Sequence, residues 1–222
     1  MPMTLPNILT LLRLFAAPAV AFAFAIWVRP QADWIALALF IGAALTDWID
    51  GYLARAWNQQ SRFGTMLDPI ADKAMVITAL AVVMGTSGLS PWVIIPAAVI
   101  LLREVFVSGL REFLGADAGR LAVTKLAKWK TTAQMVAIAT LMLSMGLQSE
   151  HAVLYHTVSA EAYETAMAAG TGWIWWSGQA GWLIGLLGLA LLWLAAVLTA
   201  LTGWDYLSKA MPYLKDVQEG TG

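Results

Sequence analysis

Four aspartates with helical spacing lie in two successive apolar segments: Asp47 and Asp50 in the first, Asp68 and Asp72 in the second. A carboxylate at membrane depth costs about 2.5–3.5 kcal/mol, so four of them require a cationic partner. Residues three or four positions apart share a helix face, so each segment would offer two carboxylates to a common point. Carboxylate oxygens are the ligands that hard divalent cations prefer. The spacing therefore predicts a hard-cation site.

The composition indicates the setting of these carboxylates. The chain has 222 residues, of which 60% are hydrophobic and 12% charged, whereas a soluble domain is about half apolar and a quarter charged. Cysteine is absent, which excludes disulfides and thiolate metal sites. The first apolar run lacks the charged start of a cleavable signal, so we expect a retained helix. These features predict an all-α, polytopic integral membrane protein.

Apolar stretches long enough to cross a bilayer predict six transmembrane helices in a single domain, 1–222. They lie near 6–28, 33–57, 64–86, 91–113, 121–147 and 179–203. The segment 148–178 is expected to be a long loop.

The distribution of lysine and arginine predicts the orientation. Of the predicted loops on the outer side, only one contains a basic residue, Arg29. The inner loops, the adjoining helix ends and the C-terminal tail contain Arg62, Arg111, Arg120, Lys125, Lys128, Lys130, Lys209 and Lys215. By the positive-inside rule both termini are cytoplasmic. The four aspartates then lie at one depth, near the cytoplasmic surface.

Small residues and one arginine accompany the aspartates. Gly51 follows Asp50, Ala54 and Arg55 lie one turn further on, and Gly64 opens the third predicted helix. Glycine inside a helix costs about 1 kcal/mol relative to alanine, and close approach of a backbone or ligand is its usual justification. The alternative is that the glycines serve helix packing and that Arg55 extends its charge to the interface. Their combination with four acids favours a ligand site.

The combined pattern D-x2-D-G-x2-A-R-x8-G-x3-D-x3-D runs from Asp47 to Asp72. It resembles the signature of the CDP-alcohol phosphotransferase (CDP-alcohol phosphatidyltransferase) family. The segments LPNILTLLRLFAAPAV, WNQQSRFGTMLDPIADKAM, LREVFVSGLREFLG and KWKTTAQM are similar to bacterial members that use glycerol 3-phosphate as acceptor. Together the similar segments cover roughly residues 5–140.

The resemblance implies a metal-dependent transferase with the fold of this family and two bound ions, Mg²⁺ or Mn²⁺. The phosphatidyl group of CDP-diacylglycerol would pass to sn-glycerol 3-phosphate, giving phosphatidylglycerol phosphate and CMP in phospholipid biosynthesis. It also implies a homodimer in the bacterial inner membrane. The metal ligands would be Asp47, Asp50, Asp68 and Asp72, and Asp72 would also be the general base towards the acceptor hydroxyl. The nucleotide would be bound by Asp50, Gly51, Ala54, Arg55 and Gly64.

Glycerol 3-phosphate is dianionic, so its pocket requires fixed positive charge at the depth of the aspartates. The residues predicted to bind this acceptor are Thr10, Arg13, Arg103, Arg111, Lys125 and Lys130. For Arg103 the alternative is an ion pair with Glu104 or with an aspartate of the pattern. For the lysines it is topogenic charge that meets anionic lipid headgroups.

Two alternative functions remain open from the sequence. A related enzyme could use another acceptor, such as inositol phosphate, serine, choline or phosphatidylglycerol. A divalent-cation transporter also places acids within the membrane, although transporters more often bind ions near the midplane on repeated units. No internal repeat is visible in this chain.

Two weaker patterns have a structural or chance explanation. Gly181, Gly185 and Gly188 have the spacing of a helix contact, but chance explains it in a chain with 18 glycines. His151 and His156 lie near acidic residues, and a solvated amphipathic or loop segment is expected there rather than a metal site.

Overall fold

The computed structural model describes residues 5–56, 61–115 and 125–219 of the 222-residue chain. Within these ranges the regular structure is entirely helical, which confirms the predicted all-α class. The described helices are α1 (Leu5–Ile26), α2 (Gln31–Ala56), α3 (Arg62–Thr86), α4 (Pro91–Leu114), α5 (Lys125–Thr157), α6 (Ala160–Ala169) and α7 (Gly172–Glu219).

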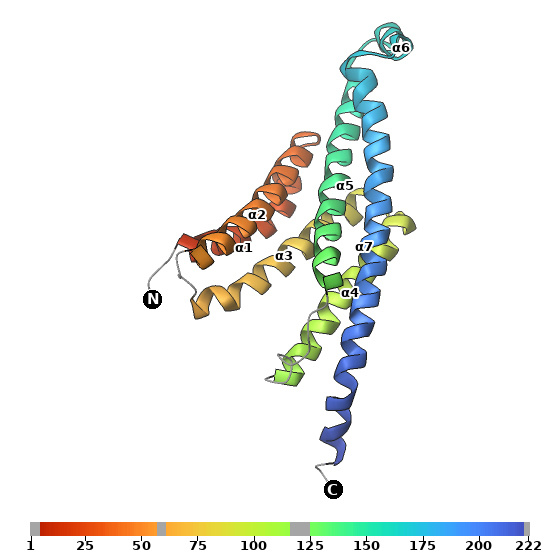
Figure 1. The fold of residues 1–222 in the computed structure, drawn as a ribbon. Helices are drawn as coiled ribbons and strands as arrows, with labels where there is room; N and C mark the ends of the chain where they lie inside the picture. Colours follow the sequence, from red (N-terminus) through yellow and green to blue (C-terminus); the bar gives the residue numbers. More distant parts are fainter. Residues whose placement is uncertain (1–4, 57–60, 116–124, 220–222) are drawn as a thin grey trace.

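The helices form two groups that meet near the centre of the molecule. α1, α2 and α3 pack together, while α5 and α7 form a long antiparallel pair, of which α7 runs the length of the protein (Figure 1). α4 packs against α7, and α6 caps the end of the α5–α7 pair (Figure 1). One interior joins the groups, and its largest fully buried side chains include Phe40, Met75, Ile100 and Ile138.

Local sequence signals explain where several helices begin and end. Ser61 caps α3 by accepting a hydrogen bond from the Gly64 amide at 2.9 Å, and a serine cap satisfies an amide that the first turn leaves unpaired. Pro91 begins α4, where its fixed φ suits the first helical turn. Gly115 follows the end of α4 with a φ of 50°. The observed bounds of α1–α4 lie close to the first four predicted spans.

The prediction of a loop at 148–178 is wrong. α5 continues to Thr157, α6 occupies Ala160–Ala169, and α7 begins at Gly172. Polar residues of α5 in this region find partners on other helices. Trp34 Nε1 of α2 donates to Glu150 Oε1 at 3.1 Å, and His151 Nε2 lies 3.0 Å from the phenol oxygen of Tyr163 on α6. The polar residues that indicated a loop are therefore residues of helices, and they form hydrogen bonds between helices.

Apolar surface on the helices indicates a membrane protein. Among the described residues, Asn7–Ile26, Pro91–Leu114 and Gly172–Leu214 are long and apolar enough to cross a bilayer. Large apolar side chains such as Phe15, Leu102 and Trp204 are exposed, as expected of a surface that faces lipid. The number of six transmembrane helices stays a prediction.

Glycines allow the close approach of α5 and α7. A Cβ added at Gly185 would lie 2.7 Å from Ser144 Oγ, and one added at Gly188 would lie 3.0 Å from the backbone nitrogen of Leu141. Gly181 contributes a third close approach, since its added Cβ would lie 3.4 Å from a backbone nitrogen of α5. Attributing this spacing to chance was therefore wrong, because small residues let the two backbones approach.

Candidate active site

Arg13 joins the aspartates of two helices. Its guanidinium nitrogen Nη1 donates to Asp47 Oδ1 on α2 and to Asp72 Oδ1 on α3. The Arg13 side chain is only 2% exposed, whereas Asp47 and Asp72 are about half exposed. One buried cation thus holds two accessible carboxylates at the junction of α1, α2 and α3. Charge-assisted hydrogen bonds of this kind are about twice as strong as neutral ones.

The third described aspartate has its own partner on α1. The hydroxyl of Thr10 donates to Asp68 Oδ1 at 2.7 Å, and Thr10 is almost fully buried. Thr10 and Arg13 are one turn apart and share the face of α1 that packs against α3. The sequence assigned both residues to the acceptor, whereas the contacts described here are with the aspartates.

Asn7 extends this polar face by another turn. Ser61 Oγ donates to Asn7 Oδ1 at 2.7 Å while it accepts from the Gly64 amide. A Cβ added at Gly64 would lie 2.9 Å from Asn7 Oδ1, so any larger residue there would force the Asn7 side chain to move. The sequence reasoning missed Asn7, although Asn7, Thr10 and Arg13 recur at three-residue intervals in an otherwise apolar helix.

The remaining residues of the aspartate pattern lie at the end of α2. The backbone is helical to Ala56, but the side chains of Asp50, Ala54 and Arg55, and the surroundings of Gly51, lie outside the described part of the structure. Their predicted roles therefore stay predictions.

The donor chemistry of the site fits a hard divalent cation. Asp47 and Asp72 reach the same Arg13 nitrogen, so two carboxylate oxygens from different helices already share one positive group. Oxygen ligands of this type suit Mg²⁺ and Mn²⁺. Among the described side chains, no three His, Cys, Asp or Glu residues group closely enough to hold a metal by themselves.

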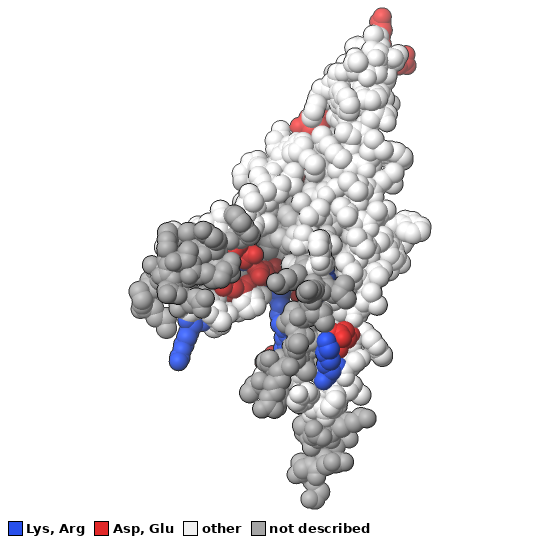
Figure 2. Space-filling model, in the orientation of Figure 1, with Lys and Arg blue, Asp and Glu red and all other residues white. Residues whose placement is uncertain are grey.

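A cavity extends from the carboxylates towards α5. It is lined by Arg13, Asp47 and Asp72, by apolar residues of α2 and α3, and by Thr131 and Met135 of α5. Figure 2 shows acidic side chains in the hollow between the α1–α3 group and the rest of the molecule, with basic side chains close by. The aspartates are thus accessible from the space between the two helix groups.

A second polar cluster lies between α4 and α5. Lys130 Nζ donates to Glu104 Oε1, and Arg103 Nη1 lies 3.5 Å from the same oxygen. All three side chains are largely buried. The ion pair between Arg103 and Glu104 was the alternative foreseen from the sequence. Two cations share one carboxylate here, so the three side chains carry a net positive charge.

Lysine at position 73 connects the two clusters. Lys73 directly follows Asp72, and its Nζ donates to Ser108 Oγ on α4. Ser108 in turn donates to the Glu104 carbonyl at 2.6 Å. The aspartate site and the basic cluster are therefore linked through successive residues of α3.

Several buried polar atoms around the basic cluster have no hydrogen-bond partner within the described part of the chain. They are Arg103 Nε, Gln134 Oε1 and the Tyr206 hydroxyl. Arg111 lies over the Tyr206 ring, with its guanidinium carbon 5.3 Å from the ring centroid. Unpaired buried polar atoms are costly, so a polar ligand would stabilise this region. The side chain of Lys125 lies outside the described residues.

These carboxylates and fixed cations, enclosed by helices with lipid-facing apolar surfaces, define an integral membrane protein that handles charged groups. The sequence profile of the CDP-alcohol phosphatidyltransferase family matches residues 3–204, and the chain belongs to this family.

Curated relatives give a narrower comparison. A CDP-diacylglycerol–glycerol-3-phosphate 3-phosphatidyltransferase of Cereibacter sphaeroides is 59% identical over 220 residues, which is 96% of this chain and 98% of the relative. The Escherichia coli (strain K12) protein of the same name is 43% identical over 156 residues, 68% of this chain and 84% of its own length. The Haemophilus influenzae protein of that name is 40% identical over 144 residues, 64% of this chain and 77% of its own length.

Proposed function

We propose that this chain transfers the phosphatidyl group of CDP-diacylglycerol to sn-glycerol 3-phosphate, giving phosphatidylglycerol phosphate and CMP. The acceptor hydroxyl oxygen would form a bond to the phosphatidyl phosphorus, and the bond from that phosphorus to the CMP oxygen would break. The observation that supports this most strongly is the meeting of carboxylates from α2 and α3 on Arg13, beside a buried cationic cluster. The names of the similar proteins indicate the same substrates.

The proposed cofactor is Mg²⁺ or Mn²⁺, with two ions held by Asp47, Asp50, Asp68 and Asp72. When bound, such ions neutralise charge on the transferring phosphoryl group. The described carboxylates supply the oxygen donors that these ions prefer. Thr10 orients Asp68 through its hydrogen bond, as outer partners of metal ligands generally do.

Asp72 is proposed as the general base that receives the proton of the acceptor hydroxyl. Its carboxylate is half exposed and lines the cavity that extends to α5, so an acceptor entering this space would meet it. The Arg13 contact fixes the position of the same carboxylate. Orientation of this kind matters because proton transfer requires hydrogen-bond distance between base and hydroxyl.

Nucleotide binding is proposed for Asp50, Gly51, Ala54, Arg55 and Gly64. For Gly64, the close approach of Asn7 supplies a structural reason for glycine. Its contribution to nucleotide binding would then be indirect, because it sets the distance between α1 and the start of α3.

The proposed acceptor pocket consists of Arg103, Arg111, Lys125 and Lys130, with Thr10 and Arg13 at its border with the aspartates. Support comes from the excess of cations over Glu104 and from the nearby Tyr206 hydroxyl, which has no hydrogen-bond partner among the described residues. A phosphate dianion would supply both the negative charge and the acceptor atoms that this region lacks. We add Gln134 and Tyr206 as candidates for contacts with the glycerol hydroxyls.

The arrangement in the membrane also belongs to this proposal. We infer one catalytic domain over 1–222 in the bacterial inner membrane, as a homodimer, with the aspartates and both termini on the cytoplasmic side. The distribution of basic residues supports the orientation, since Arg29 is the only lysine or arginine in the predicted outer loops.

The test is CMP release by the purified protein in detergent with CDP-diacylglycerol and Mg²⁺ or Mn²⁺. Each candidate acceptor is offered in turn: glycerol 3-phosphate, inositol phosphate, serine, choline and phosphatidylglycerol. We expect turnover with glycerol 3-phosphate. Turnover with another acceptor alone would refute the proposed substrate. Metal uptake into liposomes without CMP release would indicate a transporter instead.

A further inference from the structure

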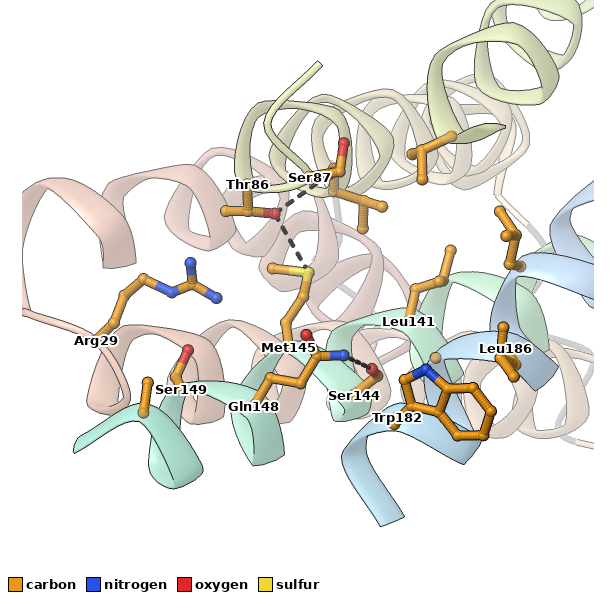
Figure 3. Close-up of a pocket in the computed structure, with 15 residues that line it drawn as sticks. Arg29, Thr86, Ser87, Leu141, Ser144, Met145, Gln148, Ser149, Trp182 and Leu186 are labelled. Carbon is orange, nitrogen blue, oxygen red and sulfur yellow. Dashed lines mark hydrogen bonds between the residues drawn. The ribbon is translucent and has the colours of Figure 1, made fainter. Parts of the chain in front are cut away.

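A second cavity lies where the C-terminal end of α3 and the start of α4 face the α5–α7 pair. None of the aspartates of the candidate site lines it. Its volume is about 440 Å³. Figure 3 shows Arg29 at one side, Thr86 and Ser87 on a second, and Gln148, Ser149 and Trp182 on the third. The proposed reaction uses none of these residues, so the cavity needs a separate explanation.

One wall of this cavity is apolar and continuous with the lipid-facing surface. Leu141, Leu186 and Leu189 line it together with Trp182, and Trp182 is 59% exposed. The neighbouring Leu183 and Leu187 on α7 are also exposed. A hydrocarbon chain in the membrane could therefore lie along α7 and enter the cavity without crossing a polar surface.

The opposite side presents an oriented cation. Arg29 Nε donates to both oxygens of Asp33, at 3.1 and 2.9 Å, and the Asp33 side chain is fully buried. This contact fixes the guanidinium but uses only one of its nitrogens. Within the described part of the chain, its two terminal nitrogens have no acceptor, and neither does the Ser149 hydroxyl. The two terminal nitrogens of a guanidinium can donate parallel hydrogen bonds to two oxygens of a phosphate group.

An apolar wall beside an interfacial arginine matches an amphiphile rather than a small solute. A free anion would leave Leu141 and Leu186 exposed to water, and an uncharged hydrocarbon would leave the Arg29 fork without a partner. Asp33 already offsets the charge of Arg29, and Glu150 is engaged by Trp34. Recognition must therefore depend on directed hydrogen bonds from the guanidinium and Ser149 rather than on a strong field.

We propose that this cavity binds one glycerophospholipid molecule, with its phosphate on Arg29 and Ser149 and an acyl chain along Leu141 and Leu186. By the orientation proposed above, this lipid belongs to the outer leaflet. The site would bind a structural or regulatory lipid, because it lies away from the carboxylates.

The experiment is native mass spectrometry of the delipidated full chain in detergent. Equal amounts of phosphatidylglycerol, phosphatidylethanolamine and diacylglycerol with identical acyl chains serve as probes. We expect one adduct of each phospholipid and at least tenfold weaker binding of diacylglycerol, which lacks phosphate. Preference between the two phospholipids would report the headgroup contribution. Equal binding of diacylglycerol would overturn the proposal.

Substitutions test whether the phospholipid binds in this cavity. Arg29→Gln combined with Asp33→Asn removes both charges and leaves no buried carboxylate unpaired, while Ser149→Phe fills the cavity. We expect each to weaken the phospholipid adduct about tenfold. Arg62→Gln, an exposed arginine at the other end of α3, is the matched control and should bind as the native chain does. Native affinity in both cavity variants, or an equal loss in the control, would refute the site. CMP release should persist in all of them, which separates this test from that of the proposed function.

Discussion

Replacing Thr10 with valine tests the connection between α1 and the metal site. Valine keeps the shape of threonine but removes the hydroxyl that donates to Asp68 Oδ1 at 2.7 Å. Thr10 is almost fully buried, so water cannot readily take its place. A hydrogen bond to a charged group contributes about 1.5–3 kcal/mol. Since about 1.4 kcal/mol corresponds to a tenfold change in an equilibrium constant, metal affinity should fall roughly 10- to 150-fold.

The assay is a Mn²⁺ titration with two readouts. Initial rates of CMP release give the half-saturating metal concentration, and electron paramagnetic resonance of free Mn²⁺ gives binding without turnover. We expect both values to rise about 10- to 150-fold, which overlaps the range for other outer partners of metal ligands, with near-normal rates at saturating metal. Thr10→Ser keeps the donor and is the control.

The reasoning would be refuted by an unchanged Mn²⁺ affinity in Thr10→Val. It would also be refuted if Thr10→Ser lost as much affinity as Thr10→Val, because the effect would then arise from packing. Thermal unfolding of both variants separates a local effect from general destabilisation.

Three further predictions concern other parts of the molecule. Asp68→Asn should abolish CMP release through lost metal binding, and near-normal activity without added metal would contradict the assignment. Lys130→Met should raise the KM for glycerol 3-phosphate about 10- to 100-fold, from one charge-assisted hydrogen bond of about 1.5–3 kcal/mol, with the KM for CDP-diacylglycerol unchanged. Gly188→Ala should lower the unfolding temperature, because an overpacking cost of about 1–3 kcal/mol outweighs the helix gain of about 1 kcal/mol. Its control is Gly42→Ala, where no atom lies within 4 Å of the added Cβ; equal effects would contradict it.

The fold could be predicted where the length of an apolar run agrees with the proline and glycine residues that mark helix ends. Pro91 and Gly115 mark the bounds of α4, and α1–α3 follow their apolar runs closely. The segment 148–178 could not be read in this way, because its polar residues have partners that are distant in sequence. His151 Nδ1 lies 3.0 Å from the Ile174 carbonyl, a contact that exists only once α5 and α7 pack together.

The candidate site, too, was predictable from the sequence only where local helix geometry determines it. Spacing alone predicted that Asp68 and Asp72 share a helix face, since that depends only on helical geometry. It could not place Thr10 or Arg13 against them, because this requires the packing of α1 on α3. The three-residue recurrence of Asn7, Thr10 and Arg13 did contain a usable signal, which was a polar stripe within an apolar helix.

The length of the α5–α7 hairpin has a practical consequence. At 1.5 Å per residue, the 33 residues of α5 and 48 residues of α7 extend about 50 and 70 Å, whereas the hydrocarbon core is about 30 Å thick. The α6 end of the hairpin lies well away from the α1–α3 group that carries the reaction site (Figure 1). An antibody fragment bound there, or an epitope inserted at Gly170, would give this small membrane protein an asymmetric landmark for particle alignment in electron cryomicroscopy.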